Sequence, residues 1–78
     1  MKVELKCFGR LVDPQKCDFR DSTTYKLKTG QTLADLIQMA GLDDGNIRVA
    51  FVNDQVVGLT TVLSDGDHVG LAPSVGGL

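Results

Sequence analysis

The sequence predicts an α+β domain in which a mixed sheet of four to five strands packs on one main helix. Three observations support this prediction. Alternating apolar and polar residues near both ends predict strands, an apolar stripe in the middle predicts a helix, and a chain of 78 residues is long enough for one domain only. One helix on one sheet is the simplest two-layer arrangement that buries both apolar faces.

Two strands are predicted before the helix. In residues 2–8, apolar and charged side chains alternate, which is the period-two pattern of a half-buried strand. Residues 9–22 are rich in Gly, Pro, Asp and Ser and predict a loop that is longer than a tight hairpin needs. Residues 23–29 alternate again, and this second strand is expected to pair antiparallel with the first.

The helix is the most strongly predicted element. Its apolar stripe consists of four residues at i, i+3, i+4 and i+7, namely Leu33, Leu36, Ile37 and Ala40. Thr32 is the expected N-cap, and Asp35 three residues later predicts a capping box. Gly41 is expected to end the helix in the left-handed conformation.

Three further strands are predicted after the helix. They are residues 47–52, a short return strand at 55–57 and a last strand at 68–72, separated by turns at 53–54 and 64–67 and by a connector at 59–63. The first and last strands can lie side by side and parallel, because the connection between them is long and contains the helix. We expect residues 1–73 to form the domain and residues 74–78 to form a flexible C-terminal tail.

The composition argues against several classes of function. A net charge of −2 with scattered basic residues argues against nucleic acid as the main partner, because binding to phosphates requires a basic patch. No segment approaches the roughly 20 apolar residues of a membrane span. The start of the sequence also lacks the features of a signal peptide. We therefore expect no membrane partner and a cytoplasmic location.

The two cysteines and the one histidine predict no metal site. Cys7 and Cys17 lie ten positions apart, and with His68 they are too few for a four-ligand zinc or iron–sulfur site. We expect Cys7 to be buried in a strand and Cys17 to lie in a loop, without a disulfide, because such bonds are rare in cytosolic proteins. His68 is expected to be exposed and without a catalytic role.

The end of the chain contains the motif that indicates a function. A Leu-Ser-Asp-Gly-Asp-His-Val turn at 63–69 leads into the last strand, then Pro73, then the diglycine Gly76-Gly77. This ending resembles that of the ubiquitin-like β-grasp sulfur carriers, which include the small subunit of molybdopterin synthase and the thiamine-pathway carrier. The length of the chain, the helix position and the turn at 52–54 agree with that family. The alternative is that the diglycine is an uninformative chain end.

The resemblance implies a carrier and not an enzyme. In it, the Gly77 carboxyl group is adenylated by a ubiquitin-activating-type adenylyltransferase, converted to a thiocarboxylate and passed to a sulfur-accepting synthase of molybdopterin or thiamine biosynthesis. The carrier binds no cofactor, because the partner enzyme supplies ATP and the sulfur donor. Gly76 and Gly77 suit this chemistry, since a tail without β-carbons can enter a narrow channel and adopt any backbone angles there.

Leu78 departs from the family pattern, because an active carrier presents a free glycine carboxylate. If the diglycine is aligned, Leu78 is an extension that a C-terminal peptidase removes. If Pro73 is aligned, Leu78 replaces the last glycine and the tail cannot react. We favour the first alignment, because it keeps Gly76-Gly77 intact.

An exposed apolar patch is expected to bind partner proteins. The resemblance and the strand alternation suggest five residues for it: Leu59, Gly70, Ala72, Pro73 and Val75. Gly70 and Ala72 are expected on the outward side of the last strand, although a bulky aromatic residue of some relatives is missing at position 72. For Leu59, an ordinary place in the core is an equal alternative.

Two other functions remain open from the sequence. A ubiquitin-like modifier would share the fold and the activation chemistry but would be conjugated through Gly77 to another protein. A non-reactive β-grasp interaction module would not need the diglycine at all. A β-grasp ferredoxin is excluded, because two cysteines cannot supply four cluster ligands.

Overall fold

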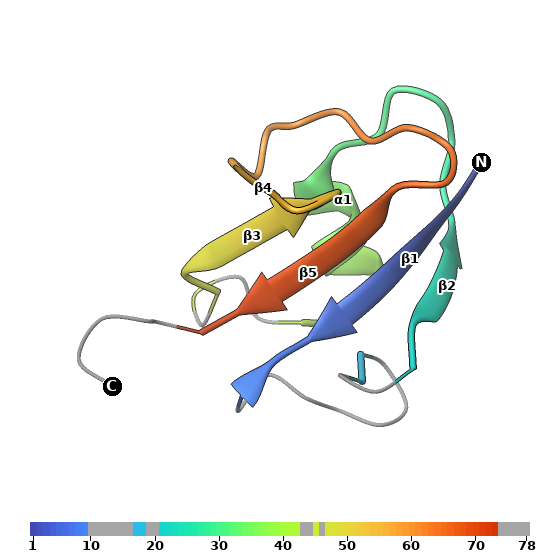
Figure 1. Ribbon diagram of the computed structural model, residues 1–78. Helices are drawn as coiled ribbons and strands as arrows, with labels where there is room; N and C mark the ends of the chain where they lie inside the picture. Colours follow the sequence, from blue (N-terminus) through green and yellow to red (C-terminus); the bar gives the residue numbers. More distant parts are fainter. Residues whose placement is uncertain (10–16, 19–20, 43–44, 46, 74–78) are drawn as a thin grey trace.

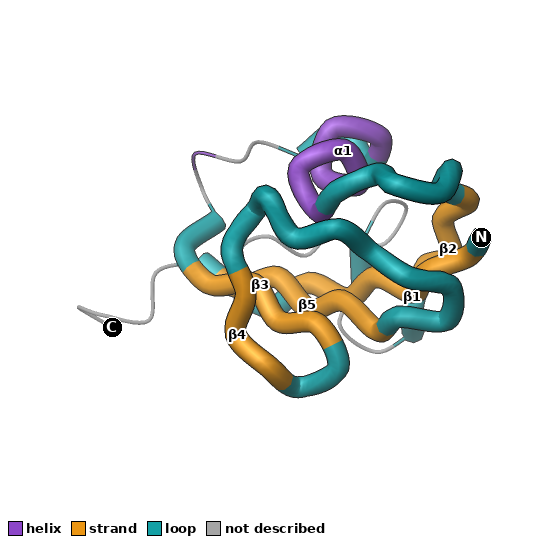
Figure 2. Tube along the Cα trace, turned by 90° about the horizontal axis from the view of Figure 1, so that it is seen from above, coloured by secondary structure: helices purple, strands orange, loops and turns teal. Residues whose placement is uncertain are grey.

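The computed structural model describes residues 1–9, 17–18, 21–42, 45 and 47–73, and this part of the chain has the predicted architecture. Its elements follow the order β1 (Lys2–Cys7), β2 (Thr23–Lys26), α1 (Leu33–Met39), β3 (Val49–Val52), β4 (Gln55–Val57) and β5 (His68–Ala72). Helix α1 lies on one side of the sheet, as Figure 2 shows when the molecule is viewed from above. The structure is therefore a two-layer α+β fold.

The sheet is mixed, with the strand order β2-β1-β5-β3-β4. β1 and β5 lie side by side and parallel at its centre (Figure 1), with Leu5 opposite Val69 and Cys7 opposite Leu71. The other pairings are antiparallel. This arrangement confirms the prediction that the first and last strands form the central parallel pair.

Three strands are shorter than predicted. β1 ends at Cys7, one residue before its predicted end. β2 ends at Lys26, because the Lys28 N–H is bonded to the Gln31 side chain at 2.8 Å and not to a neighbouring strand. β3 begins at Val49, while Ile47 before it still packs against the core. The return strand and the last strand have the predicted bounds.

The predicted caps of α1 are present. The Thr32 N–H donates to the Asp35 carboxylate at 2.8 Å, and the Asp35 N–H donates to the Thr32 hydroxyl at 3.4 Å, which completes the capping box. At the other end, Gly41 has a φ of 71°. The N–H groups of Gly41 and Leu42 donate to the carbonyls of Gln38 and Ile37, which is the Schellman arrangement.

The core lies between α1 and the inner face of the sheet. Its fully buried side chains come from the alternating positions of β1 and β5, from the helix stripe and from Cys17 between β1 and β2: Val3, Leu5, Cys7, Cys17, Leu33, Leu36 and Leu71. Burying a side chain such as Leu or Val contributes about 1.5–3 kcal/mol, so these residues supply much of the stability of so small a domain. The predicted inward faces of both strands and the helix are confirmed.

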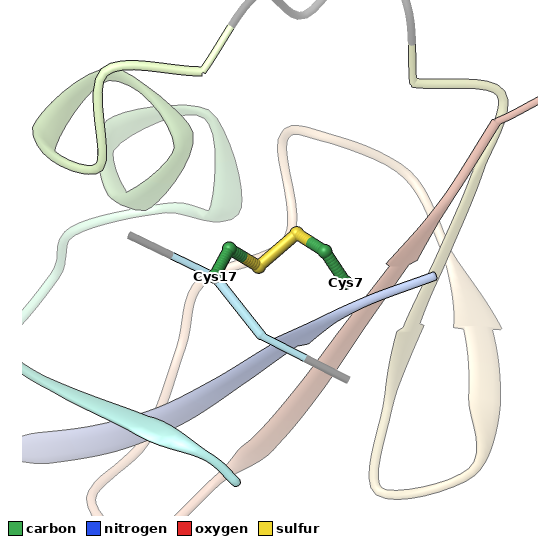
Figure 3. The surroundings of a disulfide bond; sticks show 2 residues. All are labelled: Cys7 and Cys17. Carbon is green, nitrogen blue, oxygen red and sulfur yellow. A yellow bond between two sulfur atoms is a disulfide. The ribbon is translucent and has the colours of Figure 1, made fainter. Parts of the chain in front are cut away.

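The cysteines correct one prediction, because Cys7 and Cys17 form a disulfide. Cys17 lies beside the end of β1, and the Cys7 N–H donates to the Asp18 carbonyl at 3.1 Å, so the chain returns to this point after the loop. Both cysteines are completely buried. Figure 3 shows the bond between their two sulfur atoms. The expectation of free thiols rested on the cellular compartment and could not include this return of the chain.

The turn before β5 ties three segments together at one end of the sheet. Asp65 accepts from the Lys2 N–H at 2.8 Å. Asp67 accepts from the Ser64 N–H at 2.8 Å and from the Asn53 side-chain amide at 2.9 Å. The Asp-Gly-Asp motif therefore fixes the beginning of β1, the beginning of β5 and the β3–β4 turn, which is a structural role.

Candidate functional site

β5 is the strand that precedes the C-terminal segment of the chain. β5 runs from the Asp-Gly-Asp turn to Ala72, and Pro73 is the last described residue. The Leu71 carbonyl accepts from the Phe8 N–H at 2.9 Å, and the Ala72 carbonyl accepts from the Arg48 N–H at 3.0 Å. The strand is thus bonded on both sides up to its last residue.

The face of the sheet that turns away from α1 carries a wide, shallow hollow of about 630 Å³. Its lining comes from β1 and the residue after it, from β5, from β3 and its turn, and from the residue before β2: Glu4, Lys6, Phe8, Ser22, Phe51, Asn53, Asp54, His68, Val69 and Gly70. We call this hollow the sheet-face groove. Two aromatic side chains with charged residues around them are the usual composition of a protein-binding surface.

Gly70 forms the floor of the sheet-face groove between two phenylalanines. A β-carbon at this position would lie 3.3 Å from the Phe8 ring and 3.8 Å from the Phe51 ring. Phe8 is 43% exposed, although it is a large apolar side chain. The absence of a side chain at position 70 therefore keeps open a slot with aromatic walls.

His68 and Glu4 border the groove at its polar side. The His68 Nδ1 and a Glu4 carboxylate oxygen lie 2.8 Å apart, and the two side chains are 69% and 43% exposed. The predicted exposure of His68 is confirmed, and Glu4 is its partner. The described residues also contain no group of three His, Cys, Asp or Glu side chains that could hold a metal ion.

The other predicted site residues fall into three groups. Gly70 lies in the groove, as expected for the outward side of β5. Ala72 is only 9% exposed, so the expectation that it offers an exposed surface is wrong. Leu59 packs partly against the core, which favours the core alternative. Val75, Gly76, Gly77 and Leu78 lie outside the described residues.

Sequence reasoning missed the two phenylalanines of the groove. Phe8 continues the outward series of Lys2, Glu4 and Lys6 by alternation, and this signal was available in the sequence. Phe51 lies within an apolar run, where alternation gives no direction. Its outward position follows only from its pairing opposite Gly70.

In the described part of the chain, no helix is long and apolar enough to cross a membrane.

A mixed five-stranded sheet with one helix, whose central last strand leads toward a C-terminal diglycine, defines the class of ubiquitin-like β-grasp proteins. The model of the ThiS family matches residues 11–77, and the chain belongs to this family.

Solved structures agree with this assignment. A putative molybdopterin converting factor subunit 1 from Pyrococcus furiosus is 26% identical, with a TM-score of 0.72. The match covers 96% of this chain and 99% of the P. furiosus chain. Subunit 1 in a complex of subunits 1 and 2 of the molybdopterin-converting factor from Helicobacter pylori 26695 is 28% identical, with a TM-score of 0.66 and complete coverage of both chains.

A third structure supports the fold alone. SAMP1 from Haloferax volcanii is 20% identical, with a TM-score of 0.74 and complete coverage of both chains. A search of curated proteins finds no match. The family match and the neighbours confirm the resemblance to the β-grasp sulfur carriers, whose fold ubiquitin-like modifiers share.

Proposed function

We propose that this chain is a sulfur carrier whose Gly77 carboxyl group is adenylated by a ubiquitin-activating-type adenylyltransferase and then converted to a thiocarboxylate. The observation that supports this most directly is the family match, which extends through the diglycine to residue 77. The structure of β5 adds to it, because the strand is hydrogen-bonded on both sides up to Ala72, shortly before the diglycine in the sequence. The proposed site of this chemistry is the cytoplasm.

The reaction explains why a small protein can carry sulfur without a catalytic site of its own. The Gly77 carboxylate attacks the α-phosphorus of ATP, pyrophosphate leaves, and an acyl-adenylate forms. A nucleophile whose sulfur has the oxidation level of hydrosulfide then attacks the acyl carbon. The bond to AMP breaks, and a thiocarboxylate remains. The partner enzyme supplies ATP and the sulfur donor, and the carrier contributes the acyl group and its position.

Leu78 must be removed before this reaction can occur. In the printed sequence Gly77 is joined to Leu78 by a peptide bond, so its carboxyl group is not free. A C-terminal peptidase is the proposed partner for this hydrolysis. We expect the 78-residue chain to give no adenylate, and the chain that ends at Gly77 to be a substrate.

The sheet-face groove is the proposed docking surface for the adenylyltransferase and for a sulfur-accepting synthase. Phe8 and Phe51 offer apolar contacts on either side of Gly70. Pro73 and Val75 would continue this surface along the tail. Leu59 is left out of it, because its carbonyl accepts from the Ala34 N–H at the start of α1 and its side chain packs against the core. The synthase proposal also draws on the H. pylori relative, which was solved in complex with subunit 2 of its factor.

Intact-mass spectrometry tests the chemistry. The chain that ends at Gly77 is incubated with the adenylyltransferase of its own organism, Mg-ATP and a sulfide donor. The expected product has one carboxyl oxygen replaced by sulfur, and its mass increase disappears when ATP is omitted. A chain that ends at Gly77 and gains neither AMP nor sulfur under these conditions contradicts the proposal.

Two apolar truncations test the docking surface. Phe8→Ala removes a wall of the groove, and we expect it to raise the KM for adenylation at least tenfold without unfolding the domain. Val56→Ala is the matched control, because Val56 is 70% exposed on the same sheet but does not line the groove. Equal KM values for the two variants would rule out the groove as the docking surface.

The second candidate is a ubiquitin-like modifier. It would form the same Gly77 adenylate, but the final nucleophile would be a lysine amine of another protein. Family membership and fold are compatible with both functions. The same mass spectra distinguish them, because a thiocarboxylate indicates the carrier and an isopeptide-linked adduct indicates the modifier.

A further inference from the structure

The last described residues are each held by a different neighbour. Leu71 and Ala72 accept backbone hydrogen bonds from Phe8 and Arg48 on opposite sides of β5. Pro73 has no N–H and cannot continue this ladder. Its ring instead lies against the backbone of Gly9, just after β1. The orientation of Pro73 therefore depends on packing and not on hydrogen bonds.

Gly9 permits this packing in two ways. Its φ is +62°, a left-handed conformation that residues with a β-carbon adopt at a cost. In addition, a β-carbon at Gly9 would lie 3.0 Å from Cγ and 3.3 Å from Cδ of Pro73, which is closer than such atoms ordinarily approach. Any side chain at position 9 must therefore displace the proline ring.

Displacement of Pro73 matters because the reacting carboxyl group is four residues further along the chain. Four residues in extended conformation span about 13–14 Å. When a partner's channel holds these residues extended, a rotation of about 10° at Pro73 moves Gly77 by about 2 Å relative to the docked domain, and misplacement of a reacting atom by about 1 Å can reduce a rate by about 100-fold. The direction of the chain at Pro73 thus affects how well Gly77 reaches a partner's active site.

We propose that Gly9 is a positioning residue for the tail reaction: its missing side chain seats the Pro73 ring and thereby sets the direction in which the reactive end leaves the domain. This inference rests on the proposed adenylation of Gly77. It assigns a role in that reaction to a residue far from the diglycine in sequence.

A double-mutant cycle with a matched glycine control tests the contact in the full chain. Gly9→Ala has both the strained φ and the clash with Pro73. Gly30→Ala has only the strain, because Gly30 has a φ of +93° and nothing within 4 Å of its ideal β-carbon. We expect both variants to lower the urea midpoint, and Pro73→Ala to reverse part of the loss for Gly9→Ala but none for Gly30→Ala.

NMR gives a second reading that does not depend on activity. In the wild-type chain we expect a nuclear Overhauser contact between the Gly9 α-protons and the Pro73 ring protons. Gly9→Ala should shift the Ser74 amide resonance, and Gly30→Ala should leave it in place. Absence of the wild-type contact, or equal Ser74 shifts in the two variants, would overturn the inference.

Adenylation kinetics with chains that end at Gly77 test the role itself. Gly9→Ala should lower kcat at least tenfold when Pro73 is present. In chains that already carry Pro73→Ala, adding Gly9→Ala should lower kcat less than threefold. The KM should change less than threefold in all of these variants. Gly30→Ala should retain the wild-type kcat. A loss confined to KM would indicate a disturbed Phe8 wall and overturn the inference.

The outcomes separate the two proposals. If the wild-type chain is not adenylated at all but the NMR contact and the coupling to Pro73 are present, the proposed function fails while the packing of Gly9 on Pro73 stands. If the wild-type chain is adenylated and Gly9→Ala has the same kcat, the proposed function stands and the positioning role fails.

Discussion

The two ends of β5 are held in different ways. At its beginning, side chains of Asp65, Asp67 and Asn53 accept from backbone N–H groups at the start of β1, in the turn that leads into β5 and at the start of β5. At its end, Leu71 and Ala72 are held by backbone bonds, and Pro73 is held by its contact with Gly9. Hydrogen bonds of polar side chains thus hold the first end, and the packing of the Pro73 ring on Gly9 holds the last residue of the second.

The difference matches what each end has to do. The beginning of β5 only has to hold the sheet together, and side-chain hydrogen bonds do this locally. The end leads to the residues that are proposed to enter a partner's active site, and small residues there allow the chain to pass through a narrow channel. We therefore expect changes at the beginning to affect stability alone, and changes in the contact of Gly9 with Pro73 at the end to affect the reaction as well.

The largest effect is expected from deletion of residues 76–78. Adenylation should fall below detection, because no glycine carboxylate remains, while the urea midpoint should stay within error of the wild-type value. The reference protein for this experiment is the chain that ends at Gly77. If the deleted chain keeps the biological function of the full chain, the protein is a non-reactive interaction module and neither carrier nor modifier.

The disulfide is expected to give the next largest effect, on stability. Its cysteines are ten residues apart, and closing a loop of this size stabilises a domain by about 3 kcal/mol in the chain-entropy estimate. Reduction by a dithiol should lower the free energy of unfolding by about this amount. The Cys7→Ala, Cys17→Ala double variant is the control, because it should not respond to the reductant.

Hydrogen exchange can show where the disulfide acts. Cys7 lies opposite Leu71 at the end of β5, so reduction should increase exchange of the Phe8 amide more than that of the Asn53 amide. These two amides donate to carbonyls at opposite ends of the same strand. Equal increases at both would mean that the disulfide stabilises the domain as a whole and not the tail end.

Asp67→Ala is expected to have a smaller effect at the other end. It removes the acceptor for the Ser64 N–H and for the Asn53 side chain, and loss of such bonds costs about 1–2 kcal/mol. Exchange should now increase at Asn53 more than at Phe8, the reverse of the disulfide result. Adenylation of the form that ends at Gly77 should keep its kcat, and a tenfold loss would contradict the division between the two ends.

The contrast between local hydrogen bonds and contacts of distant residues also explains what the sequence could predict. Thr32, Asp35 and Gly41 mark the helix by local chemistry, and the period-two alternation marks both central strands, so the fold followed from neighbouring residues. The disulfide and the packing of Gly9 on Pro73 join residues that are distant in sequence. Their contacts depend on the path of the chain, which no local pattern contains.

The sheet-face groove could be predicted from the sequence only in part. Alternation places Phe8 outward, but the slot exists only because β5 brings Gly70 between Phe8, just after β1, and Phe51 of β3. In the same way, alternation placed Ala72 outward without indicating that it is buried. A period-two pattern gives the side of the sheet, and exposure depends on what else packs there.

Glu4→Gln is expected to give the smallest effect. Glu4 and His68 are 2.8 Å apart but both are well exposed, and exposed pairs of this kind contribute less than about 1 kcal/mol. Glutamine keeps the shape and an acceptor oxygen, so the urea midpoint should change little, and high salt should remove the remaining difference. Exchange at Phe8 and Asn53 should be unchanged, because neither end of β5 depends on this pair. A loss of more than about 1 kcal/mol would show that the polar border of the groove stabilises the sheet, and the groove could then not be altered independently of the fold.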